Sequence, residues 1–330
     1  MTATLAGVGA ALPERVLNND DFAHLDTSDE WIVQRTGIRE RRRLADDASL
    51  AELAALACDR ALSDAGVVPR DIHHVVVATS TADRISPGMA VEVGTRLGID
   101  RPAAFDVSAG CSGFVYALDH AIAVIESGRS EHVLVCGAEA LSRITDHTDR
   151  NTAVLLGDGA GAVVVSRSPE SLRPVFVLGS DGAQIGLLYV GQDRLLRMSG
   201  REIFASAVNA MADHTQLVLE RCGLRPDDLD LLVAHQANAR IVQAVARRLG
   251  VRADQVFLNV DKVANTSSAS IPLALAHAHD RRLLQPGAVV GLTAFGAGLS
   301  WGAGVITWKA PGAAGPPRGA GEAPRSRGRR

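Results

Sequence analysis

The sequence predicts an α/β protein made of two related halves. Two observations support this prediction: short Val- and Ala-rich runs alternate with longer helical patterns, and part of the first half recurs in the second. Strands and helices mixed at these lengths are typical of sheets whose faces are covered by helices. With 330 residues, of which 47% are hydrophobic, the chain is long enough to bury a sizeable core.

The expected elements alternate along the chain. The strand runs are short and bounded by Gly, Pro or polar residues; they are Leu5–Leu12, Val75–Ser80, Ala104–Ser108, Val133–Ala138 and Ala162–Ser166. The helical patterns are longer; they are Leu50–Ala65, Pro87–Leu97, Cys111–Ser127 and Glu202–Cys222.

The internal repeat consists of a helix end, a Gly, a Pro/Asp turn and a buried strand. Three residue pairs keep one constant offset along the chain: Gly66/Gly223, Pro69/Pro226 and Asp71/Asp228. A second match, Leu97-Gly-Ile before Phe105 and Leu249-Gly-Val before Phe257, has nearly the same offset. Two matches in register indicate a duplicated half. We therefore expect a first half at residues 1–170, a second at 171–309, and a disordered tail without apolar periodicity at 310–330.

The bulk properties argue against several classes of function. The net charge of −3 at pH 7 gives no general attraction to nucleic acid or to an anionic membrane. No run approaches the roughly 20 apolar residues that span a bilayer, and the N-terminus lacks a signal-peptide pattern, so we expect a cytoplasmic protein. The four cysteines lie far apart, with no CxxC pair and no His at ligand spacing. Neither a disulfide framework nor a metal site is expected.

Cys111 is the first candidate for chemistry. It follows an apolar strand and opens a long helix, in the segment Ala104-Phe-Asp-Val-Ser-Ala-Gly-Cys-Ser-Gly-Phe. A helix N-terminus favours the thiolate and lowers the pKa of the thiol, and small neighbours let a substrate approach. From these residues alone, a nucleophilic Cys and a packed Cys are equally supported. Cys58, Cys136 and Cys222 lack this context and are expected in the core.

Three further segments carry candidate groups at the ends of expected elements. His235 ends a buried strand just before a helix that begins near Asn238, where α/β folds place ligands. Asn265 opens another helix, and the glycine-rich turn at 294–302 is able to present a backbone N–H to an oxyanion. Singly, these are more often a structural His, a helix cap and an ordinary turn. The seam between two related halves is a natural place for Cys111, His235 and Asn265 to converge.

Taken together, these motifs resemble the β-ketoacyl-acyl-carrier-protein synthase III family, which initiates type II fatty acid synthesis. The similarity runs from about residue 3 to residue 308. Besides the Cys111 segment it rests on Asp26-Thr-Ser-Asp-Glu-Trp-Ile, Arg35-Thr-Gly-Ile-Arg-Glu-Arg, Asp149-Arg150, Gly157-Asp-Gly-Ala-Gly, His235-Gln-Ala-Asn, Asn265-Thr-Ser and Phe295-Gly-Ala-Gly. The resemblance implies a thiolase-like five-layer αβαβα fold of two duplicated halves, usually as a homodimer.

The resemblance also implies a reaction. Cys111 would take an acyl group from acyl-CoA as a thioester. His235 and Asn265 would hydrogen-bond the thioester carbonyl of malonyl-acyl-carrier protein and stabilise the enolate left when CO2 departs. That carbanion would attack the acyl-Cys and give a 3-oxoacyl product. Backbone N–H groups of Cys111 and Ala297 would form the oxyanion hole. The reaction needs no metal or redox cofactor, and acyl-CoA is a substrate.

The family's binding positions carry over in the same way. An indole and arginines suit an adenine and phosphates, and the CoA-contacting positions fall on Thr27, Trp31, Arg35, Arg150 and Asn238. A lysine that helps to dock the carrier protein is replaced by Ala205. A basic face for docking remains on the neighbouring helix, at Arg240, Arg247 and Arg248.

The chain departs from the family at other positions too. At the dimer contact that floors the acyl pocket many members carry Phe, whereas this chain carries Ser86, so we expect room for a longer or branched primer. Val263-Ala264 replaces the family's His-Gly or Tyr-Gly before Asn265, and the segment between Asp181 and Gly200 is shorter than usual.

These departures leave other functions open. The nearest is a related enzyme that primes a polyketide or joins an acyl group to another acceptor; acceptance of malonyl-carrier protein with release of CO2 would discriminate the two. A non-catalytic carrier-binding partner of a ketosynthase is disfavoured, because such subunits lack the nucleophile. A Cys–His hydrolase is equally disfavoured.

Overall fold

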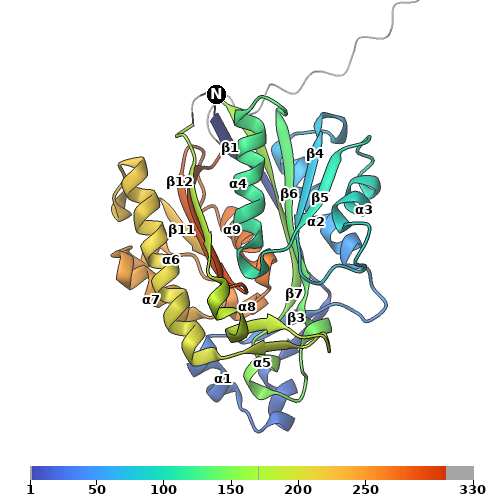
Figure 1. The fold of residues 1–330 in the computed structure, drawn as a ribbon, viewed down its shortest axis with the longest axis vertical. Coiled ribbons are helices and arrows are strands. Elements are labelled where there is room, and N and C mark those ends of the chain that lie inside the picture. The colour runs from blue at the N-terminus through green and yellow to red at the C-terminus, as the bar shows by residue number, and fades with distance from the viewer. Residues whose placement is uncertain (1, 170, 310–330) are drawn as a thin grey trace, which may run out of the picture.

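Two β-sheets form the framework of the protein (Figure 1). The computed structural model describes residues 2–169 and 171–309, so the predicted tail lies outside the described residues. The first sheet has the strand order β1-β7-β6-β4-β5. Its strands are β1 (Thr2–Ala11), β4 (His74–Ala78), β5 (Ala103–Val107), β6 (His132–Ala140) and β7 (Asp158–Ser168). The second sheet has the order β11-β12-β13-β8, with β8 (Val175–Ser180), β11 (Leu231–Ala234), β12 (Val289–Gly296) and β13 (Ser300–Thr307).

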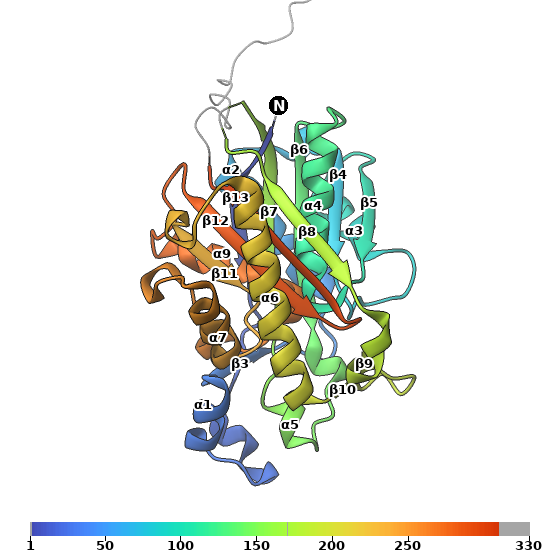
Figure 2. The same cartoon turned by 60° about the vertical axis from the view of Figure 1, so that its left-hand side comes forward.

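Helices form three layers around these sheets, as the two views show (Figures 1 and 2). The first sheet is covered on its outer face by α2 (Leu50–Ala65) and α3 (Met89–Arg96). Between the sheets lie α4 (Gly113–Glu126) and α9 (Ser270–Asp280), and the outer face of the second sheet carries α6 (Gly200–Cys222) and α7 (Ala239–Leu249). This confirms the expected five-layer αβαβα fold. The buried faces of α4 and α9 are rich in small and aliphatic residues, which lets both sheets pack closely on them.

The two sheets repeat one topology, which confirms the predicted duplication. β4 pairs with β6 in parallel, and β6 with β7 and β7 with β1 antiparallel; β11, β12, β13 and β8 pair in the same senses. The local repeat is visible in the backbone as well, because Gly66 and Gly223 end α2 and α6 with φ of 65° and 67°. Such positive φ angles favour glycine. The boundary between the halves at residue 170 stays a prediction.

Most expected elements are found with shifted ends. The helix Leu50–Ala65 is as predicted. The helix expected from Pro87 begins at Met89, because the Asp106 carboxylate accepts hydrogen bonds from the N–H groups of Met89 and Ala90. Cys111 does not lie inside the long helix: it occupies the 3-10 turn η3 (Gly110–Ser112), and α4 begins at Gly113.

The smaller elements gather at the lower end of the molecule in Figure 1 and surround the ends of both sheets. They include β2 (Arg15–Asn18), β3 (Glu40–Arg43), α1 (Asp29–Thr36), α5 (Arg150–Ala153), α8 (Val260–Val263) and the hairpin of β9 (Leu188–Val190) and β10 (Leu196–Met198). Short 3-10 turns complete the chain, at η1 (Asn19–Leu25), η2 (Pro69–Asp71), η4 (Leu141–Ile144), η5 (Gly182–Leu187), η6 (Pro226–Asp228), η7 (Ala253–Gln255) and η8 (Ser267–Ala269).

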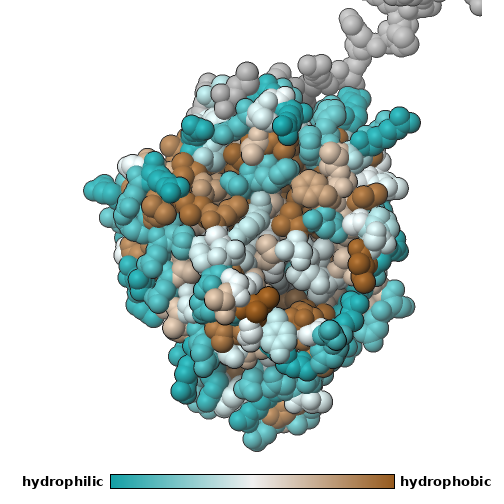
Figure 3. All heavy atoms as spheres, in the orientation of Figure 1, coloured by the Kyte–Doolittle hydropathy of each residue, from teal (hydrophilic) through white to brown (hydrophobic). Residues whose placement is uncertain are grey.

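The described part of the chain contains no helix long and apolar enough to cross a membrane. On the face drawn in Figure 3, hydrophobic residues lie in separate patches among hydrophilic ones.

Candidate active site

A cavity of about 590 Å³ lies where the two halves meet. Its lining includes Cys111 from the first half and both His235 and Asn265 from the second. The three side chains that the sequence singled out therefore face one space. Apolar residues form much of the remaining wall; they are Leu188, Leu196 and Met198 of the β9–β10 hairpin, Ile203, Phe204 and Met211 of α6, and Phe295 of β12.

Cys111 sits where η3 touches the β12–β13 turn. A Cβ on Gly296 would lie 2.6 Å from the backbone N of Cys111, so glycine is required for this approach. A Cβ on Gly110 would lie 3.0 Å from the backbone N of Ala297, which places that N–H beside the same turn. The two N–H groups predicted for an oxyanion hole are thus neighbours.

Burial controls the acidity of the Cys111 thiol. The pKa of the thiol is raised to about 11, chiefly by burial; a hydrogen bond from Ser267 lowers it, and the negative charge of Glu139 raises it. This is opposite to the lowered pKa that we expected from a helix N-terminus. The thiol is therefore neutral at pH 7.

His235 follows β11 and is 3% exposed. Its backbone N–H donates to the carbonyl of Thr293 at 2.7 Å, which holds it in line with the second sheet. Its Nδ1 lies 2.7 Å from the hydroxyl oxygen of Ser270. Burial lowers the pKa of His235 to about 4, so the ring is neutral at pH 7.

Asn265 is held by its backbone against the first half. Its N–H donates to the carbonyl of Leu155 at 3.0 Å, and its carbonyl accepts from the N–H of Gly157 at 2.9 Å. Ala264 before it has φ 57° and ψ −160°, a region that favours glycine. Ala264 thus has a backbone conformation typical of glycine, at the position where the family that this chain resembles carries Gly.

The mouth of the cavity carries most of the residues predicted to contact CoA. Trp31, Arg35, Arg150 and Asn238 line it, whereas Thr27 does not and instead donates its hydroxyl to the carbonyl of Phe22 at 2.7 Å. The guanidinium of Arg35 lies 4.2 Å from the centre of the Trp31 ring and that of Arg150 lies 5.4 Å from it. Asn238 also caps α7, since its side chain accepts from the N–H of Ile241.

The arginines predicted for carrier docking are spread along α7. Arg240 lines the cavity and lies over the ring of Phe204, 5.6 Å from its centre. Arg247 and Arg248 are exposed two turns further along the helix. Arg248 is engaged in the structure, because it donates to the side chains of Asn209 and Asp213.

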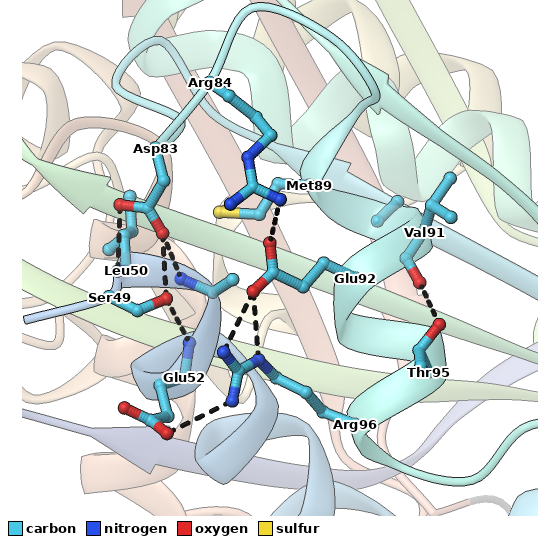
Figure 4. Close-up of polar contacts among 12 residues, drawn as sticks. Ser49, Leu50, Glu52, Asp83, Arg84, Met89, Val91, Glu92, Thr95 and Arg96 are labelled. Atoms are coloured by element: carbon cyan, nitrogen blue, oxygen red, sulfur yellow. Dashed lines mark hydrogen bonds and ion pairs between the residues drawn. The ribbon is translucent and has the colours of Figure 1, made fainter.

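Ser86 lies outside its own chain's cavity, on the exposed loop between β4 and α3. Figure 4 shows how this loop is anchored. The Asp83 carboxylate accepts from Ser49 and from the N–H of Leu50, and Arg84 pairs with Glu92 at 3.2 Å. The loop is therefore fixed just before Ser86.

Sequence reasoning missed three polar residues near the centre and one at the mouth. Ser267 and Glu139 act on Cys111, Ser270 contacts His235, and Arg201 at the start of α6 lines the cavity. The serines stand in the same run of small polar residues as Asn265, which was a usable signal. Glu139 lies within an apolar strand, where an acidic side chain is rarely buried without a hydrogen-bonding or charged partner.

Comparison with known proteins decides the family. The family models described as 3-oxoacyl-[acyl-carrier-protein] synthase III and its C-terminal part match residues 105–182 and 219–308. Beta-ketoacyl-[acyl-carrier-protein] synthase III of Chelativorans sp. is 47% identical, and the match covers 93% of this chain and 99% of that protein. The chain belongs to the 3-oxoacyl-acyl-carrier-protein synthase III family. The protein of that name from Geobacillus kaustophilus is 45% identical, with 93% and 99% of the two chains covered.

Solved structures of family members share the thiolase-like fold of this chain. The 3-oxoacyl-[acyl-carrier-protein] synthase III of Aquifex aeolicus has a TM-score of 0.90 and 42% identity, and the match covers 93% of this chain and all of that one. A priming β-ketosynthase from the R1128 polyketide biosynthetic pathway has a TM-score of 0.89 at 36% identity, with 94% and 97% covered. The fold is thus shared with a priming ketosynthase of a polyketide pathway.

Proposed function

We propose that this protein is a β-ketoacyl-acyl-carrier-protein synthase III, an acyltransferase that joins an acyl-CoA primer to malonyl-acyl-carrier protein. The observation that carries the proposal is that Cys111, His235 and Asn265 line one cavity with a cationic, aromatic mouth. Relatives 43–47% identical over nearly their whole length bear this name. Their identity exceeds the 36% of the priming ketosynthase, so fatty acid initiation is favoured over polyketide priming.

The first step is acyl transfer to Cys111. The thiol loses its proton as its sulfur attacks the thioester carbonyl of acyl-CoA; the new C–S bond forms, the old one breaks, and the proton ends on the CoA thiol. The N–H groups of Cys111 and Ala297 are the donors proposed for the oxyanion. Because the thiol is neutral at rest, its proton leaves only as the sulfur attacks.

The second step is decarboxylative condensation. The neutral ring of His235 and the carboxamide of Asn265 donate hydrogen bonds to the malonyl thioester oxygen, where negative charge develops as CO2 leaves. The enolate carbon attacks acyl-Cys111 and the acyl–sulfur bond breaks, which gives a 3-oxoacyl-carrier protein. The Cys111 thiolate that leaves takes up a proton from water and becomes the neutral thiol again. A neutral His suits this task, and burial keeps it neutral. The proposed steps require no cofactor.

Both substrates are proposed to enter at one mouth. Trp31, Arg35, Arg150 and Asn238 offer a stacking face and charges to CoA, with Thr27 nearby in sequence but outside the cavity lining. The carrier protein is proposed to dock on α7 through Arg240, Arg247 and Arg248, which suits an acidic partner. The four cysteines are free, as in a reducing compartment, which supports a cytoplasmic location.

A homodimer is proposed from the open edge of the first sheet. β5 is an edge strand whose Phe105 is 37% exposed, and the nearby Ile85 is 96% exposed. Open edges and exposed apolar side chains are typical of surfaces covered by a partner. In such a dimer the loop that carries Ser86 would reach the acyl pocket of the second copy. Light scattering during size-exclusion chromatography is expected to give twice the chain mass.

Intact-protein mass spectrometry tests the function directly. Incubation with acyl-CoA is expected to add one acyl mass, and Cys111→Ser to abolish that addition. Cys222→Ser, at a partly buried thiol outside the cavity lining, is the matched control and should load normally. Malonyl-acyl-carrier protein should then discharge the acyl group with release of CO2. Loading of the Cys111→Ser variant, or discharge without CO2 release, would overturn the proposal.

A further inference from the structure

Glu139 in β6 is a buried carboxyl group that the proposed reaction does not use. Its exposed fraction is 0%, and no Lys, Arg or His among the described residues forms an ion pair with it. A buried carboxylate is costly unless it is well hydrogen-bonded. Its presence beside Cys111 therefore needs a reason.

The hydrogen-bond donors around Glu139 come from both halves of the protein. From the first half, the Ser80 N–H lies 3.2 and 3.1 Å from the two carboxyl oxygens, and the Thr81 hydroxyl lies 2.6 Å from Oε2. From the second half, the hydroxyls of Ser267 and Ser268 lie 3.2 and 2.9 Å from Oε1. The carboxyl thus joins the two halves across the seam.

The backbone is tightly packed at this point. A Cβ on Gly137, two residues before Glu139, would lie 2.2 Å from the carbonyl oxygen of Ser268. Only glycine allows β6 and η8 to approach so closely. Close contact brings the serine hydroxyls within reach of the carboxyl.

Ser267 links Glu139 to two of the catalytic candidates. Its backbone N–H donates to Oδ1 of Asn265 at 2.8 Å, which fixes the orientation of that carboxamide. Its hydroxyl lies 3.2 Å from Oε1 of Glu139 and also lowers the pKa of the Cys111 thiol. Ser267 itself has a φ of 49°, which is uncommon for a residue other than glycine and requires support from its surroundings.

We propose that Glu139 is a positioning residue that acts through Ser267, holding the Asn265 carboxamide and the hydroxyl that faces Cys111. The proposal rests on the reaction proposed above and adds to it a residue that touches no substrate. Glu139 has a second effect: when it is ionised, its negative charge raises the pKa of the Cys111 thiol. Burial raises the pKa of Glu139 itself, and the hydrogen bonds from Thr81, Ser80 and the two serines lower it. The orientation of the Asn265 carboxamide and the acidity of the Cys111 thiol therefore both depend on Glu139.

The test uses Glu139→Gln and Ser267→Ala in the full-length enzyme. Both should lower kcat for condensation by roughly 100-fold, because a small misplacement of a catalytic group has an effect of this size. Their effects on the thiol should be opposite. Alkylation of Cys111 by iodoacetamide should become faster in Glu139→Gln at pH values where Glu139 is ionised, because a nearby negative charge is lost. It should become slower in Ser267→Ala, where the thiolate loses a donor.

Asp158→Asn is the matched control. Asp158 is also a buried carboxyl, and it accepts hydrogen bonds from Ser142 and from the N–H of Leu44. It does not line the cavity. Its variant should lose thermal stability without a change in the pH profile of alkylation. Thermal unfolding of all variants shows which losses of activity follow from unfolding.

The outcomes separate this proposal from the proposed function. Equal alkylation profiles in wild type, Glu139→Gln and Ser267→Ala would overturn the positioning role, as would wild-type condensation in Glu139→Gln. If alkylation of the Glu139→Gln variant falls in parallel with its folded fraction, Glu139 only stabilises the fold and has no positioning role. If the wild type fails to condense malonyl-acyl-carrier protein, the proposed function fails, yet the alkylation profiles still decide the role of Glu139.

Discussion

Nδ1 of His235 lies 2.7 Å from Oγ of Ser270, and that oxygen also accepts a hydrogen bond from the backbone N–H of Gln236 at 3.3 Å. The Ser270 hydroxyl has one proton to donate, and Nδ1 is the ring nitrogen within its reach. When Ser270 donates to Nδ1, the neutral ring carries its own proton on Nε2. This is the tautomer that the proposed condensation needs, because Nε2 must donate to the malonyl thioester oxygen.

Replacing Ser270 by Ala should uncouple the two steps of the reaction. Without the hydroxyl the ring loses its tautomeric preference, so we expect kcat for condensation to fall roughly 100-fold, as when one oxyanion donor is removed. Loading of Cys111 should remain within a few-fold of wild type. Single-turnover mass spectrometry measures the two steps separately. Equal losses in both steps would contradict the assignment of His235 to condensation alone.

The lowered pKa of His235 predicts how stability depends on pH. Its pKa is about 4 in the folded protein and 6.5 in the unfolded chain, so only the unfolded chain takes up this proton between those values. Stability should therefore fall as pH drops from 6.5 to 4, by roughly 3 kcal/mol from this residue. Urea unfolding at pH 7.5 and pH 4.5 measures the fall.

Comparison of variants isolates the contribution of His235 from that of the carboxylates. His235→Asn should lose less stability over this pH range than the wild type does. His24→Asn, at an exposed position, should behave as the wild type. If the His235→Asn curve matches the wild type, another group is responsible for the pH dependence.

The sequence predicts which candidate groups line the cavity better than it predicts the residues that contact them. The approach of His235 and Asn265 to Cys111 follows from strand ends and from the duplicated topology, which local patterns encode. The acidity of Cys111 was predicted in the wrong direction. A helix N-terminus can be predicted from the sequence. The burial of Cys111 and its proximity to Glu139, which raise the pKa of the thiol, depend on tertiary packing. Ser270 and Glu139 were missed for the same reason, since their partners are distant in the chain.

The raised pKa of Cys111 is open to direct measurement. With a pKa of about 11, the thiolate fraction in the resting enzyme at pH 7 is roughly one in ten thousand. The rate of alkylation by iodoacetamide should therefore rise steadily from pH 7 to pH 9.5 without a plateau. Peptide mapping by mass spectrometry assigns the label to Cys111. A plateau near pH 7 would indicate that the helix N-terminus outweighs burial.

Ser86 should set the range of primers if the proposed dimer forms. Ser86→Phe would place a large ring at the acyl pocket of the second copy, so loading by octanoyl-CoA should fall while loading by acetyl-CoA persists. Arg84→Ala on the same loop serves as a control for disturbance of the loop, since it removes the pair with Glu92 without filling a pocket. Intact-protein mass spectrometry across acetyl-, isobutyryl-, octanoyl- and lauroyl-CoA gives the profile. A sharp preference of the wild type for acetyl-CoA would contradict the prediction.

Arg247 tests docking of the carrier protein on α7. It is exposed and lies two turns along the helix from Arg240, whose side chain lines the cavity. Arg247→Glu should raise KM for malonyl-acyl-carrier protein several-fold and leave acyl-CoA loading unchanged, because a charge reversal on a docking face acts on association. The effect should weaken as ionic strength rises, since exposed charges are screened. Arg221→Glu, near the far end of α6 and about 25 Å along that helix from the cavity-lining Phe204, is the control. Equal effects of the two reversals would mean that net charge, rather than this face, governs binding of the carrier.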